Sequence, residues 1–270
     1  EDSAYHVAKP PFSRHSSTQE VGQHSWPDPA HLPLDAFARR ARALRERTDR
    51  AIVLELPGRV FSLGQRLCGF EDWLMSLIGH PSLATKLLDT AVEIEIEMVR
   101  GILEAAEDHV DVVLCPDDLG MQDRPIISPD LYRKMIKPHH RKLFGAIRDW
   151  TDAKLMLHSD GAIAPLIGDL VDVGVEVLNP VQVSASRLGD TAKLKKEHGA
   201  HLCFWGAVDT HRVLPQGTAS DARNEVKRRI EDLAVGGGYV LASVHNIQSD
   251  VPPENLCAMF EAAREHGIYD

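Results

Sequence analysis

The sequence predicts an α/β fold made of repeated strand–helix units, and three observations lead to this class. Short runs rich in Val, Leu and Ile recur along the 270 residues, each run stops on a polar cluster, and a helical pattern follows. Continuous apolar runs are typical of parallel strands that are buried on both faces. Strands that alternate with helices indicate βα units around a parallel sheet.

Six apolar runs have the strand pattern, and helical material follows each of them. The predicted strands lie at 51–56, 110–114, 153–157, 175–178, 201–205 and 239–244. Because eight βα units close a barrel of about 250 residues, two units are missing from a complete barrel. Either these units precede residue 1 in a longer parent chain, or the sheet is open.

Apolar spacings of three and four residues, with start and stop signals, place the helices. They are predicted at 34–47, 69–78, 81–107, 128–150, 162–173, 188–198, 218–234 and 252–267. Ser128 before Pro129 reads as an N-cap with proline at the first helical position, and Pro138 predicts a bend in that helix. Residues 1–30 are polar, so we expect an N-terminal arm or loop there and a barrel domain over 31–270.

Composition favours a soluble protein with small-molecule chemistry. The hydrophobic fraction of 43% and the charged fraction of 26% are those of globular proteins. A net charge of −10 argues against nucleic acid or anionic membranes as partners. Four distant cysteines without a C-x-x-C pair predict reduced, mostly buried thiols in a cytoplasmic protein. No membrane span or signal peptide is expected, and the first residue, Glu1, indicates a processed or truncated chain.

Polar side chains at strand ends form the main candidate site, because ligands bind at the carboxyl ends of parallel strands. His158 and Asp160 follow one strand two residues apart, so both can face the same cavity, and His245 follows the last strand. Two imidazoles and a carboxylate suit Zn²⁺ or another divalent metal with an open position for substrate. The alternative is that His158 bonds a neighbouring loop and Asp160 caps the next helix.

The adjacent carboxylates of Asp117 and Asp118 end another strand. Like charges this close raise one of the two pKa values, which suits general acid catalysis or the binding of a cation or a pyrrole N–H. The alternative is that each residue caps a turn around Gly120.

The remaining candidates are weaker. Side chains able to orient a substrate, or to hold loops together, are Asn179, Gln182, Asn246 and Gln248, and Asp209 is either a site residue or an N-cap. Cys115 is expected in the core, and His139 and His140 are expected on the exposed surface of a helix.

An ordered set of motifs resembles the uroporphyrinogen decarboxylase superfamily from about residue 26 to the end. The motifs include Asp117-Asp118-Leu119-Gly120, Ile127-Ser128-Pro129-Asp130, His158-Ser159-Asp160-Gly161, Asn179-Pro180-Val181-Gln182, Phe204-Trp205-Gly206 and His245-Asn246-Ile247-Gln248. The resemblance implies a TIM (β/α)₈ barrel with its site at the carboxyl-terminal mouth. It also implies a longer parent whose first two strands precede residue 1.

The superfamily contains two chemistries. Its decarboxylases need no cofactor and use an Arg-rich N-terminal segment, which this sequence lacks. Its corrinoid-linked methyltransferases bind Zn²⁺ through a His-x-Cys pair and a later Cys on the last strand. Here His158 matches the histidine, Asp160 stands in place of the first cysteine and His245 lies near the second, which makes a harder site. The motifs around His158 and His245 are most similar to the methyltransferase branch.

The resemblance therefore implies an enzyme that transfers a methyl group from a small methylated substrate to a corrinoid carrier, in the manner of an O-demethylase. His158, Asp160 and His245 would hold a divalent metal, expected to be Zn²⁺. Asp118, Asn179 and Gln182 would position the substrate. One alternative is a cofactor-free decarboxylase of a tetrapyrrole. In that case Asp117 or Asp118 would stabilise the pyrrole intermediate and His245 would contact a carboxylate. A second alternative is a non-catalytic binding fragment.

Overall fold

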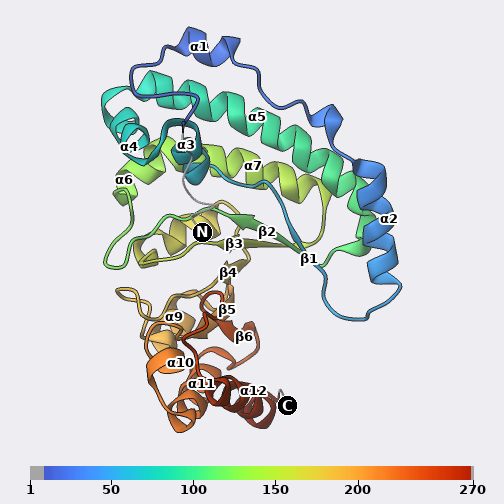
Figure 1. The fold of residues 1–270 in the computed structure, drawn as a ribbon, viewed down its shortest axis with the longest axis vertical. Coiled ribbons are helices and arrows are strands. Elements are labelled where there is room, and N and C mark those ends of the chain that lie inside the picture. The colour runs from blue at the N-terminus through green and yellow to red at the C-terminus, as the bar shows by residue number, and fades with distance from the viewer. Residues whose placement is uncertain (1–8, 269–270) are drawn as a thin grey trace. The chain divides into compact units, whose positions relative to one another are not determined.

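The computed structural model describes residues 9–268, which form two compact units (Figure 1). The first unit comprises the chain up to Asp117 together with Ile127–Leu155. The second comprises Asp118–Ile126 and the chain from Met156 onward. None of the helices in the described part of the chain combines the length and the apolar character that crossing a membrane requires.

The first unit contains two strands and most of the long helices. Its elements are α1 (Thr18–Gln23), α2 (Leu34–Arg45), β1 (Val53–Glu55), α3 (Phe61–Cys68), α4 (Phe70–Gly79), α5 (Pro81–Ala106), β2 (Val112–Pro116), α6 (Pro129–Leu131) and α7 (Lys137–Trp150). β1 and β2 are parallel, with Val53 opposite Val112 and Glu55 opposite Leu114. The carboxyl ends of both strands therefore lie on one edge of the pair.

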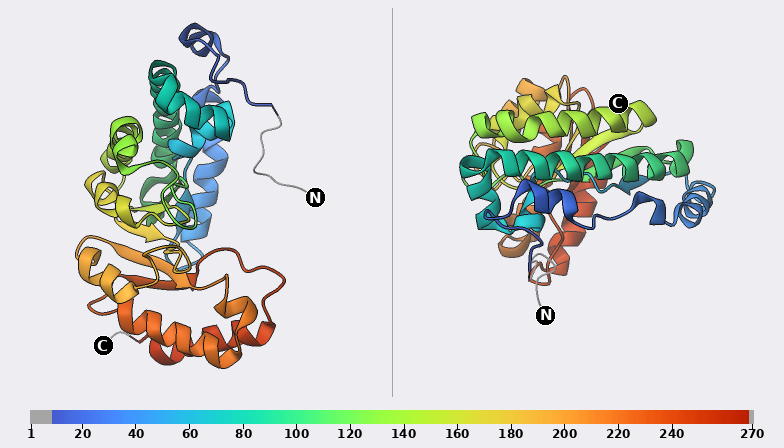
Figure 2. Two further views of the ribbon diagram at one scale, coloured as in Figure 1. Left: turned by 90° about the vertical axis from the view of Figure 1, so that its left-hand side faces the viewer. Right: turned by 90° about the horizontal axis from the view of Figure 1, so that it is seen from above.

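Helix α5 forms as its apolar spacing predicts. Pro81 occupies its first turn, where the missing N–H removes no helical hydrogen bond. Its buried stripe includes Leu87, Val92 and Val99, each fully shielded from solvent. The helix lies beside α7 in both figures of the whole chain (Figures 1 and 2), and α7 contributes buried Phe144 to the same core.

The start of α7 differs from expectation. The chain forms a wider turn over Tyr132–Ile136, in which the N–H of Lys137 bonds to the carbonyl of Tyr132. Pro138 has no N–H to continue an ordinary helical ladder, which agrees with a wider turn just before it. The prediction that His139 and His140 are exposed is wrong: they are 8% and 0% exposed.

Partners from elsewhere in the first unit explain why these histidines are buried. His139 Nε2 lies 2.9 Å from a carboxylate oxygen of Asp89 on α5. His140 Nε2 lies 2.9 Å from Asp117 Oδ2, and its Nδ1 lies 3.1 Å from the hydroxyl of Tyr132. Both rings are thus polar groups satisfied inside the unit.

The N-terminal region, expected to be an arm or loop, contains the short helix α1. Ser17 accepts from the N–H of Glu20, and Glu20 in turn accepts from the N–H of Ser17, which is a capping box. Phe12 and Val21 are buried, and the Phe12 ring stacks on Trp26 with centroids 5.9 Å apart. Local capping and apolar contacts thus order this stretch.

The second unit carries the other strands and the helices from α8 onward. Its elements are β3 (Lys154–His158, which begins in the first unit), α8 (Ile167–Asp172), β4 (Val177–Asn179), α9 (Thr191–His198), β5 (Cys203–Val208), α10 (Val213–Gln216), α11 (Ala219–Leu233), β6 (Tyr239–Ser243) and α12 (Pro253–His266). β3 to β6 pair in chain order and are all parallel. All six predicted strands are present, with ends that agree within a few residues.

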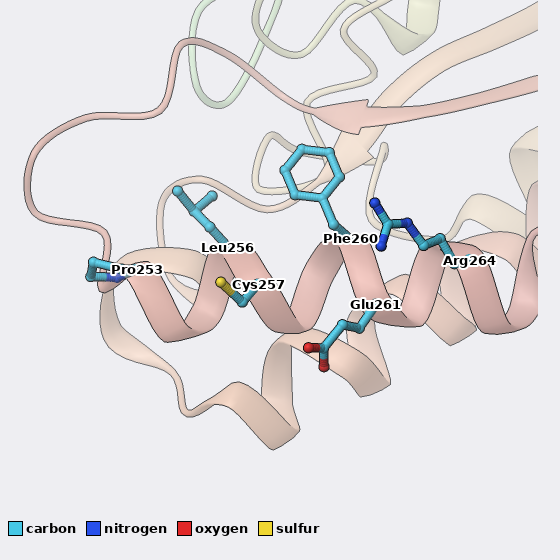
Figure 3. Close-up of a pocket in the computed structure, with 6 residues that line it drawn as sticks. All are labelled: Pro253, Leu256, Cys257, Phe260, Glu261 and Arg264. Carbon is cyan, nitrogen blue, oxygen red and sulfur yellow. The ribbon is translucent and has the colours of Figure 1, made fainter.

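The core of the second unit lies between α11, α12 and the strands. A capping box between Thr218 and Asp221 starts α11, and Val226 packs with Met259 of α12 in one buried cluster. The opposite side of α12 lines a shallow hollow with partly exposed side chains (Figure 3). Among them is Cys257, which is exposed, whereas Cys68 and Cys115 are buried as expected; all four cysteines are free.

Candidate metal centre

The candidate site begins at the carboxyl end of β3. His158 is the last residue of the strand, and Asp160 follows two positions later. The side chain between them, Ser159, is 2% exposed and its hydroxyl accepts from the N–H of Leu119 at 2.9 Å. Because successive side chains of an extended chain point to opposite sides, His158 and Asp160 share the side away from Ser159.

His245 completes the cluster from the carboxyl end of β6. Its Nε2 atom lies 3.7 Å from Asp160 Oδ2, and His158 Nε2 lies 3.7 Å from the same oxygen. The three potential ligand atoms all lie within 4.8 Å of one another, and the cluster is the one group of this kind among the described residues. The structure thus brings together the three residues that the sequence analysis selected as metal ligands.

Backbone hydrogen bonds fix the loop that carries Asp160. The N–H of Asp160 donates to Asp118 Oδ1 at 3.0 Å, and the N–H of Gly161 donates to Gln182 Oε1 at 2.7 Å. Gly161 has φ +86° and packs so closely on Gly120 that a Cβ atom would approach the Gly120 backbone to 2.4 Å. Only glycine fits this contact without displacement of the backbone.

Asn179 is the neighbour of His158 across the sheet. The two residues are paired in the β3–β4 register, and Asn179 Oδ1 lies 2.5 Å from His158 Nδ1. The amide nitrogen of Asn179 donates to the carbonyl of Trp205 at 3.1 Å. Asn179 thus joins a potential metal ligand on β3 to the backbone of β5.

The electrostatics of the cluster favour positive charge. Burial opposes protonation of His158, but hydrogen bonds to Asp160 and Asn179, with the negative charges of Asp160 and Asp118, raise the pKa of this histidine. A proton or a bound cation would therefore be stabilised among these side chains.

The carboxylate of Asp117 has a structural position within the first unit. It is 1% exposed and accepts from the N–H groups of Phe61 at 2.8 Å and Ser62 at 2.7 Å, at the start of α3. Burial alone would raise its pKa, but the bonds to His140 and Ser62 prevail and lower it. Both of its oxygens therefore accept hydrogen bonds from groups of the first unit, and a contact of Asp117 with substrate stays a prediction.

The other predicted side chains have different surroundings. Asp209 is buried and accepts from the N–H groups of His211 and Arg212, in the turn that precedes α10, and the N-cap residue of α10 is Arg212. Gln182 joins loops through Gly161 and Gln122. Asn246 and Gln248 are exposed beside His245, with the Gln248 amide donating to the Asn246 carbonyl.

Sequence reasoning missed Glu95, a buried carboxyl group on α5. It is 8% exposed, and its Oε2 atom has no hydrogen-bond partner in the described structure. A signal was available, because Glu95 lies four residues after Ala91 and four before Val99 on the apolar stripe of the helix.

The fold and the cluster together define an α/β protein with parallel strands and a candidate metal centre at their carboxyl ends. The chain belongs to the uroporphyrinogen decarboxylase (URO-D) family, whose sequence model matches residues 5–266. The family expected from the motifs is therefore confirmed.

Comparison with solved structures supports the same fold. A methyltransferase from Methanosarcina mazei superposes with a TM-score of 0.68 at 24% sequence identity, over 86% of this chain and 64% of that chain. At this identity the likeness is one of fold. The chain spans somewhat less than two thirds of that protein's length. No curated protein sequence matches the chain.

Proposed function

We propose that the protein is a methyltransferase that moves a methyl group from a small methylated substrate to a corrinoid carrier on a partner protein. The observation that carries the proposal is the convergence of His158, Asp160 and His245 at two strand ends. Family membership and a fold shared with a methyltransferase support the reaction class.

The donor set fits a divalent metal. Two imidazole nitrogens and one carboxylate oxygen are ligands that Zn²⁺ accepts, and three protein ligands leave a coordination position for substrate. Tetrahedral zinc with bonds of about 2.0–2.1 Å separates its ligand atoms by about 3.3 Å. The 3.7 Å separations of Asp160 from each histidine are near this value. When bound, such a metal would supply Lewis acidity toward a substrate oxygen.

The protein side chains supply orientation and access. Asp118 holds the Asp160 backbone and adds a second negative charge near the cluster. His245 is the most exposed of the three ligands, at 43% against 24% for His158 and 30% for Asp160. We therefore propose that substrate approaches from the His245 side, where Asn246 and Gln248 offer amide groups.

Decarboxylation of a tetrapyrrole is the less supported alternative. It requires an accessible carboxylate for the pyrrole N–H groups, and Asp117 is buried with both oxygens occupied. Asp118 alone could serve that reaction. The binding-fragment alternative predicts neither stoichiometric metal nor turnover.

Metal content tests the proposal most directly. We expect about one divalent metal per chain in the wild-type protein by elemental analysis, and loss of it in His158→Ala and His245→Ala. His201→Ala removes an exposed histidine elsewhere in the second unit and should retain the metal. A wild-type protein that stays metal-free after incubation with Zn²⁺ and desalting would overturn the three-ligand centre. Demethylation of a methoxylated aromatic with a free corrinoid acceptor then tests the reaction itself.

A further inference from the structure

The contact between Asn179 and His158 determines which nitrogen of the histidine carries a proton. The carbonyl of Trp205 can only accept a hydrogen bond, so the group 3.1 Å from it must be the amide nitrogen of Asn179. The amide oxygen of Asn179 is then the atom 2.5 Å from His158 Nδ1. Two acceptors do not share a hydrogen bond, so Nδ1 must be the donor.

A neutral imidazole has one N–H and one lone pair. With the proton on Nδ1, the lone pair of His158 lies on Nε2, the atom that faces Asp160 Oδ2. From this we infer that Asn179 is a positioning residue: it holds His158 in the Nδ1–H tautomer and orients Nε2 toward the cluster as a metal ligand. This assignment replaces the substrate-orienting role that the sequence suggested for Asn179.

The sheet prevents Asn179 from adopting another arrangement. Its main chain is held by β4, and its carbonyl accepts from the N–H of Ser159 at 2.8 Å, on the residue next to His158. The side chain is bound at both ends, by His158 on β3 and by the Trp205 carbonyl on β5. Three adjacent strands therefore specify the direction of one imidazole ring.

This arrangement matters for affinity because the partner of a ligating histidine fixes its tautomer and raises its basicity. Removal of such a partner typically weakens metal affinity about 10–100-fold. The role of His158 as a metal ligand rests on the proposed function, but the tautomer of His158 can be measured without any metal.

Long-range ¹H–¹⁵N NMR of the histidine rings reads the tautomer directly. The spectra are recorded at high pH, where the ring is neutral, and the His158 signals are assigned by their loss in His158→Ala. We expect the Nδ1–H tautomer in wild type. In Asn179→Ala the Nε2–H form should gain population. Asn224→Ala, an exposed amide on α11, is the matched control and should behave as wild type.

Titration with Zn²⁺ is the second measurement. Asn179→Ala should bind about 10–100-fold more weakly than wild type and the Asn224→Ala control. An Nε2–H tautomer in wild type, or unchanged tautomer and affinity in Asn179→Ala, would each overturn the inference. Absence of metal binding in wild type with the expected tautomer would instead overturn the proposed function alone.

Discussion

Glu95 should make the protein less stable as pH rises through neutrality. Its carboxyl group is 8% exposed on α5, and burial, followed by the negative charge of Asp117, raises its pKa from 4.5 to about 9. The charge and the backbone N–H of Arg59 oppose this shift without reversing it. Glu95 is therefore protonated in the folded protein at pH 7.

The sign of the effect follows from proton binding. Between pH 4.5 and about 9, Glu95 is protonated in the folded chain and ionised in the unfolded chain. The folded state thus binds one more proton, so the free energy of unfolding falls as pH rises. One proton corresponds to about 1.4 kcal/mol per pH unit, or roughly 3 kcal/mol between pH 6 and pH 8.

Glu95→Gln removes the ionisable group with little change of shape. Urea unfolding of the variant and of wild type is followed by circular dichroism at pH 6, 7 and 8. The free energy of unfolding of the variant, relative to that of wild type, should increase by about 1.4 kcal/mol for each pH unit. Glu104→Gln, on the exposed side of the same helix, should parallel wild type. If the free energy of unfolding depended on pH in the same way for Glu95→Gln and wild type, the reasoning would be refuted, because the pKa of Glu95 would then be the same in the folded and unfolded chain.

Two further substitutions test the packing of the second unit. Gly161→Ala should destabilise by several kcal/mol and lower metal content, because alanine is strained at φ +86° and its Cβ would lie 2.4 Å from the Gly120 backbone. Gly168→Ala on α8, where a Cβ meets nothing within 4 Å, should be neutral or stabilising, and thermal unfolding compares the two. Arg229→Met should cost about 3–5 kcal/mol in urea unfolding, because Arg229 is 2% exposed and bonds Glu225 at 2.9 Å. The double variant with Glu225→Leu should recover part of that loss, and a double variant no more stable than Arg229→Met would contradict the ion-pair explanation.

The sequence was informative where structure depends on neighbours along the chain. Six apolar runs predicted six strands, and the motif His158-Ser159-Asp160 predicted two side chains on one side because extended residues alternate. The meeting of His158 with His245 followed from the rule that parallel strands place their carboxyl ends on one edge. These inferences need only local periodicity and a general rule of topology.

Contacts made by distant residues were beyond local reasoning. Helix α3 was not predicted, because no side chain next to its start caps it. Asp117 caps it instead, from more than fifty positions along the chain, by accepting from the N–H groups of Phe61 and Ser62. The burial of His140 escaped notice for the same reason, since its partner is also Asp117.

Asp117 and Asp118 show how adjacent, chemically identical residues acquire different tasks. After β2, the side chain of Asp117 lies at the first turn of α3, where N–H groups and the helix dipole stabilise its negative charge. The side chain of the next residue, Asp118, lies at the loop after β3, where one of its oxygens accepts a hydrogen bond from the N–H of Asp160. A carboxylate saturated by buried donors has no free capacity for a ligand, whereas Asp118 is exposed and adds its charge to that around His158. Substitution of Asp118, and not of Asp117, should therefore change the proposed metal centre.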